Sequence, residues 1–138
     1  LNLGGADIVV IDTPKLYSQT FNLLVGNEYR LAQTRKSTAV LSALDEAIQF
    51  IKKNPDEAKR IMARDAGIDS ETVKAAWHTY QFELTLRQSL LSTVQGQARW
   101  ARREGHVAPN LSEPEFLNFV DSSLLRKVKP DAVDFVFP

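Results

Sequence analysis

The stretch 34–67, TRKSTAVLSALDEAIQFIKKNPDEAKRIMARDAG, carries the strongest structural signals in the chain. Its first part places apolar side chains at helical spacing on one face: Val40, Leu44, Ala47, Ile48 and Ile51. This pattern predicts a helix that begins near Thr34 and ends near Lys53. We expect its apolar face, with Leu44 at the centre, to be fully buried.

The second part of the stretch predicts another helix. Asn54 is the expected N-cap, and Pro55 suits the first helical position. Asp56 and Glu57 place negative charge in the first turn, where it complements the helix dipole. Gly67 marks the end of this helix.

Further helices are expected towards the C-terminus. A third helix begins at Asp69 or Ser70 and runs to about Thr79, and the alternating segment 81–86 is expected to be extended. A fourth helix spans about 87–104.

Capping residues predict the ends of the remaining helices. Gly105 suits a left-handed cap after the fourth helix. Ser112 and Glu115 have the spacing of a capping box before a short helix, and Asp121 is expected to cap one more turn.

The first 26 residues have strand character instead. Ala6 to Ile11 is a β-branched run between turn residues, and Phe21 to Val25 is a second apolar run. The predicted fold class is therefore α+β and mostly α-helical, with two short N-terminal strands followed by five or six helices. Residues 1–138 are expected to form one domain, in which 1–26 is a strand and crossing segment and 27–138 is helical.

Length and charge restrict the function. A chain of 138 residues and 15.5 kDa fits one domain. Seventeen basic and seventeen acidic side chains balance, so no net field attracts nucleic acid. The chain contains no cysteine, which excludes thiol catalysis. Its longest aliphatic run, Ile8 to Ile11, is far shorter than the ~20 residues that span a bilayer.

The sequence lacks common catalytic motifs. His78 and His106 have no metal-ligand spacing around them, and no G-x-S-x-G, P-loop or G-x-G-x-x-G motif occurs. We therefore predict no catalytic residue, no metal and no cofactor. The aromatic residues Trp77, Tyr80 and Phe82 are expected to pack between helices.

Four polar and aromatic residues are candidates for ligand binding. Asp12 and Thr13 follow the first predicted strand, where open α/β sheets bind their ligands. Alternatively, they form a turn that ends the strand. Phe21 and Asn22 begin the second strand and have the groups to stack on and hydrogen-bond a small polar solute. Their alternative is a core phenylalanine beside an asparagine that bonds the backbone.

The order of the segments resembles a known family of receptors. ADIVVIDTP and FNLLVGNEY are followed by STAVLSALDEAIQFIKKNPDEAKRIMARDAGIDSETVKAAW, then by YQFELTL, LLSTVQGQARWARREGHV and FLNFVDSSLLRKV. This series is similar to the C-terminal part of the solute-binding proteins of ABC importers, in the nitrate, sulfonate, taurine and thiamine-pyrimidine-precursor class. The resemblance covers nearly the whole chain and implies part of a two-lobe, periplasmic-binding-protein-like α/β fold.

The resemblance implies a non-enzymatic function. A small solute would bind between two lobes, near Asp12 and Thr13, while Phe21 and Asn22 mark the return crossing between the lobes. The closed receptor would then deliver the solute to an ABC permease in the inner membrane. The implied location is the periplasm. Because family members are about twice as long, we expect these residues to be one portion of such a receptor, without its signal peptide.

Other functions stay open at this point. The same scaffold also carries enzymes or sensors, such as relatives of pyrimidine-precursor synthases. A self-standing helical interaction module is the third reading. The apolar N-terminal strands, if left without neighbours, also predict a homodimer of this chain.

Overall fold

The computed structural model describes residues 19–134, and these residues are mostly helical. The elements in chain order are α1 (Asn27–Ala32), α2 (Thr34–Lys53), α3 (Pro55–Ala66), α4 (Ser70–Ala76), the 3-10 turn η1 (Trp77–Thr79), α5 (Gln88–Arg103), η2 (Phe116–Phe119), α6 (Ser123–Val128) and η3 (Pro130–Ala132). The mostly helical prediction is confirmed.

The prediction of a strand over Phe21–Val25 is wrong. These residues form no strand, and Phe21 and Leu24 are 84% and 88% exposed. A strand requires a neighbour that accepts its backbone hydrogen bonds, and no other described segment pairs with this one. The first predicted strand, Ala6 to Ile11, lies outside the described residues.

The helices α2 and α3 begin and end close to the predicted residues. Pro55 stands at the first turn of α3, and Gly67 ends that helix in the left-handed conformation, with φ 64°. Asn54 does not act as predicted, because its side chain does not cap α3. Its amide instead donates to the Phe50 carbonyl oxygen at 3.3 Å, which closes the last turn of α2.

The Asp69 carboxylate caps α4. It accepts a hydrogen bond from the backbone N–H of Thr72 at 2.9 Å. Val73, only 2% exposed, then anchors α4 in the small core that it forms with α3. After η1 the chain runs to Leu86 without helix or strand, and of the alternating segment only Leu86 forms a bridge.

The helix α5 is held by residues near the end of the described chain. Leu86 and Val133 form a parallel bridge, and the backbone N–H of Gln88 donates to the Asp134 carboxylate at 2.6 Å. Gly105, with φ 77°, follows the helix in the predicted left-handed conformation.

The predicted capping box is absent, because residues 111–115 are not helical and no side chain caps η2. Polar contacts hold this segment against α5 instead: the Arg102 guanidinium donates to the Leu111 carbonyl oxygen, and Arg99 lies 3.8 Å from Glu113. Asp121 does cap the following turn, because its carboxylate accepts from the backbone N–H of Ser123 at 2.7 Å.

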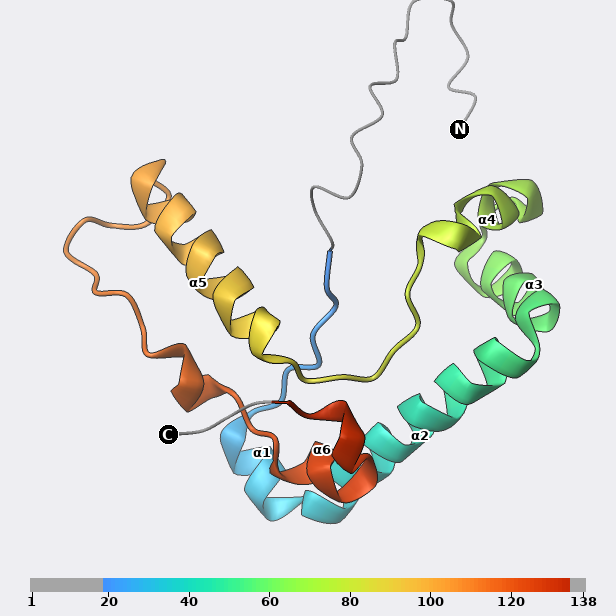
Figure 1. Ribbon diagram of the computed structural model, residues 1–138, viewed down its shortest axis with the longest axis horizontal. Coiled ribbons are helices and arrows are strands. Elements are labelled where there is room, and N and C mark those ends of the chain that lie inside the picture. The colour runs from blue at the N-terminus through green and yellow to red at the C-terminus, as the bar shows by residue number, and fades with distance from the viewer. Residues whose placement is uncertain (1–18, 135–138) are drawn as a thin grey trace, which may run out of the picture.

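The helices form two arms that diverge from a common base (Figure 1). From the base, where α1 and α6 lie, α2 leads to α3 and α4 on one side, while α5 stands on the other. The extended segment 80–87 connects the two sides. No described helix is long and apolar enough to cross a membrane.

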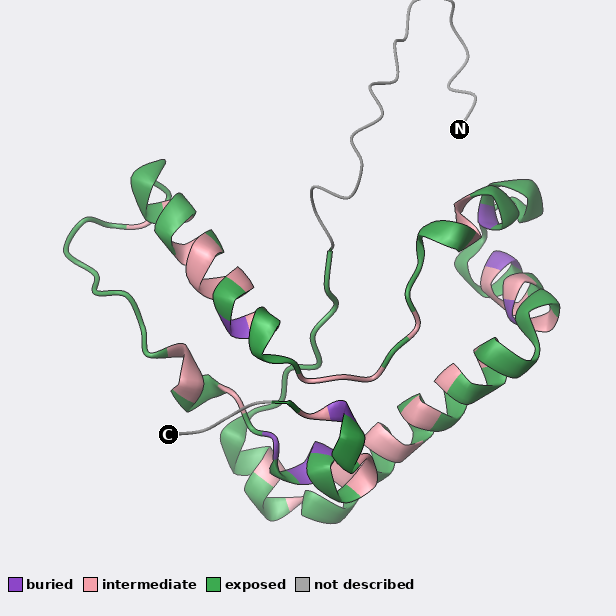
Figure 2. Cartoon of the chain, viewed as in Figure 1, coloured by how far each residue is buried: buried purple, intermediate pink, exposed green. Residues whose placement is uncertain are grey.

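Burial is sparse throughout this arrangement (Figure 2). The buried apolar residues of the described part are Ala58, Ala63, Val73, Leu91, Leu124, Leu125 and Ala132.

The expected burial of the α2 stripe is also wrong. Leu44 is 38% exposed and Val40 is 47% exposed. The helix α6 packs on α2, and the half-buried residues of α2 include Leu41, Asp45 and Ile48. The row through Val40 and Leu44 is therefore left largely uncovered.

Candidate functional site

The predicted ligand-binding residues do not form a site in the described structure. Asp12 and Thr13 lie outside the described residues. Phe21 and Asn22 are both exposed in the segment that precedes α1, and no hydrogen bond joins Asn22 to another described residue. Neither the stacking pocket nor the core phenylalanine expected from the sequence is present at Phe21.

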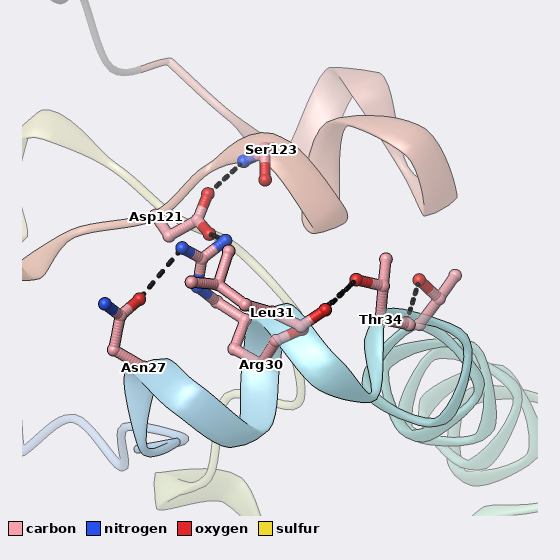
Figure 3. A network of polar contacts seen from close by, with 7 residues as sticks. Asn27, Arg30, Leu31, Thr34, Asp121 and Ser123 are labelled. Atoms are coloured by element: carbon pink, nitrogen blue, oxygen red, sulfur yellow. Dashed lines mark hydrogen bonds and ion pairs between the residues drawn. The ribbon is translucent and has the colours of Figure 1, made fainter.

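A network of polar side chains lies just beyond this segment (Figure 3). Arg30 of α1 forms an ion pair with Asp121, which precedes α6, at 2.5 Å between Nη1 and Oδ2. Another nitrogen of the same guanidinium donates to Asn27 Oδ1 at 3.0 Å. The other oxygen of Asp121 accepts the hydrogen bond from the Ser123 backbone. One carboxylate thus joins α1 to the start of α6.

The local sequence of α1 explains why the Asn27 and Arg30 side chains lie together. Asn27 and Arg30 are three residues apart and so lie on one face of α1. The backbone N–H of Arg30 donates to the Gly26 carbonyl oxygen at 2.9 Å, which fixes the first turn of this short helix. At the other end, the Thr34 hydroxyl donates to the Leu31 carbonyl oxygen at 3.3 Å and leads the chain into α2.

The network keeps Asp121 ionised. Partial burial raises the pKa of its carboxyl, but hydrogen bonds from Ser123 and the charge of Arg30 outweigh burial and lower the pKa below 3.8. A carboxyl with a lowered pKa is a poor proton donor at neutral pH. The ionised Asp121 carboxylate is therefore suited to holding α1 and the start of α6 together, and not to transferring a proton.

A second ion pair fixes the other end of α6. Lys129 Nζ lies 2.6 Å from the Asp45 carboxylate of α2, with about a quarter to a third of each side chain exposed. Together with Arg30 and Asp121, this pair ties α1, α2 and α6 into one unit at the base of the molecule.

An apolar groove of about 470 Å³ lies where α2 meets α3 and η1. It is lined by Ala47, Phe50, Ile51, Ala58, Ile61, Met62, Trp77 and Phe82. The ring centroids of Trp77 and Phe82 are 5.0 Å apart, and those of Tyr80 and Phe82 are 5.8 Å apart. The three rings lie close together, but Tyr80 is 41% exposed and the other two line the groove, so they are not packed between helices as predicted.

The chemistry of this groove favours an apolar surface as its occupant. Its lining contains no charged side chain, and a small polar solute requires polar groups that orient it. Lys59 Nζ lies 5.5 Å from the centre of the Trp77 ring, but its charge is matched by Asp56 at 3.0 Å.

No metal centre occurs in residues 19–134, because no three His, Asp or Glu side chains gather there. The His106 ring instead lies 5.2 Å from that of Trp100.

Sequence reasoning missed the role of Arg30. The range 27–138 was expected to be helical, but no separate helix was predicted at Asn27–Ala32, because six residues carry no apolar stripe. Nothing near Arg30 identifies a partner as distant as Asp121. Asp121 itself was identified, but only as a cap.

No family model matches the chain, and no similar curated protein or solved structure was found.

Proposed function

We propose that this chain is the C-terminal part of the solute-binding component of an ABC importer. The receptor would belong to the nitrate, sulfonate, taurine and pyrimidine-precursor class and work in the periplasm. In this proposal it captures a small solute between two lobes and presents it to a membrane permease. The solute makes more contacts in the closed state and so shifts the population towards closure. No bond is made or broken.

The observation that carries the proposal is the uncovered apolar surface of the helical scaffold. Ala47 lines the groove at α2, α3 and η1 and lies three residues after the exposed Leu44, on the same side of α2. Helices with such faces are stable when another layer of structure covers them. The remaining α/β part of a two-lobe receptor is a layer of the required kind.

The first test is the mass of the protein in its native source. A tag at the C-terminus of the chromosomal gene allows the intact protein to be isolated and weighed. We expect a mass near twice 15.5 kDa. A mass of 15.5 kDa, with no second chain attached, would contradict the proposal.

The second test is solute binding by that intact protein. Calorimetry with nitrate, taurine, an alkylsulfonate and an aminopyrimidine should give saturable binding of one of them, and mass spectrometry should recover that solute unchanged. A chemically altered solute would favour the enzyme reading. No binding by a folded protein would favour the helical interaction module, whose support is the same uncovered surface.

The isolated 138-residue chain provides the control. It should bind the same solute at least about a hundredfold more weakly, because losing one wall of the cleft removes several hydrogen bonds of about 1–3 kcal/mol each. Equal affinities would place the whole site within these residues and contradict a site shared between lobes.

A further inference from the structure

We propose that Arg30 and Asp121 are positioning residues that form the fixed end of the interlobe hinge. They would hold α1 against the base of the molecule, so that bending is confined to residues 19–26. This inference rests on the proposed function, in which residues 19–26 cross from one lobe to the other.

The helix α1 has no buried side chain that would hold it by packing. It has six residues, and none of them is buried. A helix this short is unstable alone in water. Arg30 and Asp121 are among its few fixed contacts, and their side chains are 26% and 33% exposed. Partial burial makes this pair stronger than a typical surface ion pair.

The segment that precedes α1 has no regular secondary structure in residues 19–26. Residues 19–25 are exposed and have no helix, strand or backbone hydrogen bond to another described residue. Gly26, at the junction with α1, has open space where a Cβ would lie. Within residues 19–134, the first helical hydrogen bond joins the Arg30 N–H to the Gly26 carbonyl oxygen.

The Arg30–Asp121 pair joins α1 to α6, and α6 is itself held on α2. Asp121 is fixed by the Ser123 backbone at the start of α6 (Figure 3), and the Lys129–Asp45 pair fixes the end of α6 on α2. A hinge needs a few free residues beside a body that does not deform. Residues 19–26 and the base formed by α1, α2 and α6 have these two properties.

Four variants separate the effect of the Arg30–Asp121 ion pair from other effects of changing these side chains. Arg30→Gln removes the charge, and Arg30→Lys keeps it. Asp121→Asn removes the charge but keeps Oδ1 as an acceptor for Ser123. Arg35→Gln is the matched control, because Arg35 lies in the first turn of α2 and forms no ion pair with another described residue. Circular dichroism checks that each variant keeps its helices.

Hydrogen exchange on the 138-residue chain tests the anchor. Amide exchange in residues 27–33 should rise about five- to tenfold in Arg30→Gln and Asp121→Asn. It should rise less in Arg30→Lys and stay unchanged in Arg35→Gln. If amide exchange in residues 27–33 is unchanged in Arg30→Gln and Asp121→Asn, the ion pair does not hold α1. This outcome does not depend on which solute the receptor binds.

Solute affinity of the intact receptor tests the hinge. Looser anchoring lowers the fraction of closure-competent molecules, so Arg30→Gln should weaken binding about three- to tenfold. Faster exchange with unchanged affinity would overturn the hinge role and leave the proposed function standing. A wild-type receptor that binds no solute would overturn both.

Discussion

Gly67 and Gly96 both have space for a methyl group, because no atom lies within 4 Å of where a Cβ would be. They differ in backbone conformation. Gly67 has φ 64°, which costs an alanine about 1 kcal/mol. Gly96 lies in the interior of α5, where alanine is favoured by about 1 kcal/mol. Gly67→Ala should therefore lower the free energy of unfolding, and Gly96→Ala should raise it. Urea denaturation checks both, and equal signs would contradict the assigned conformations.

The Asp69 cap should make the stability of α4 depend on pH. The hydrogen bond from the Thr72 backbone lowers the pKa of its carboxyl below 3.8. Its stabilisation of α4 is therefore complete above about pH 4 and is lost as the pH falls through the lowered pKa. An asparagine at this position would cap without titrating, so the stability difference between wild type and Asp69→Asn should change only below about pH 4. A constant difference between about pH 6 and pH 2 would contradict this role.

The elements α2 and α6 carry leucines in different surroundings. Leu125 of α6 is 7% exposed and Leu44 of α2 is 38% exposed. Leu125→Ala should cost about 2–4 kcal/mol of unfolding free energy, whereas Leu44→Ala should cost about 1 kcal/mol. Chemical denaturation of the two variants makes the comparison. Equal losses would mean that another chain covers Leu44 in solution.

The helix α5 depends on a cap from a distant part of the chain. Asp134 accepts the Gln88 N–H, and no side chain near Gln88 caps the helix. Asp134→Ala should cost about 1 kcal/mol and expose the first turn of α5 to hydrogen exchange. Asp131→Ala, which removes a nearby exposed carboxylate, is the control and should leave that turn protected. Equal effects in both variants would argue against a specific cap.

The elements also show what the sequence could predict. α2 and α3 were predicted because Pro55, Gly67 and the helical period act locally. A separate α1 was missed because its six residues carry no apolar stripe. Phe21 was expected in a strand, but strand formation depends on a neighbour that local sequence does not specify. The candidate site could not be predicted for the same reason.

At the scale of the whole molecule, exposed apolar residues predict self-association of the isolated chain. Phe21 and Leu24 are almost fully exposed, and large apolar patches commonly mark contact surfaces. Light scattering at micromolar concentration should give about twice the mass of 15.5 kDa. The double variant Phe21→Ser, Leu24→Ser should be a monomer, whereas Phe119→Ser should remain a dimer. A monomeric wild type would contradict the homodimer.

The distant cap of α5 also has a consequence for the order of events during synthesis. Gln88 is made 46 residues before the carboxylate that completes its hydrogen bonding. Until Asp134 has been added, the first turn of α5 has an unsatisfied N–H and the Leu86–Val133 bridge cannot form. The α2–α3 pair, in contrast, has its start and stop signals within its own sequence. The α2–α3 arm can therefore fold early during synthesis, while α5 must wait until Asp134 has been made.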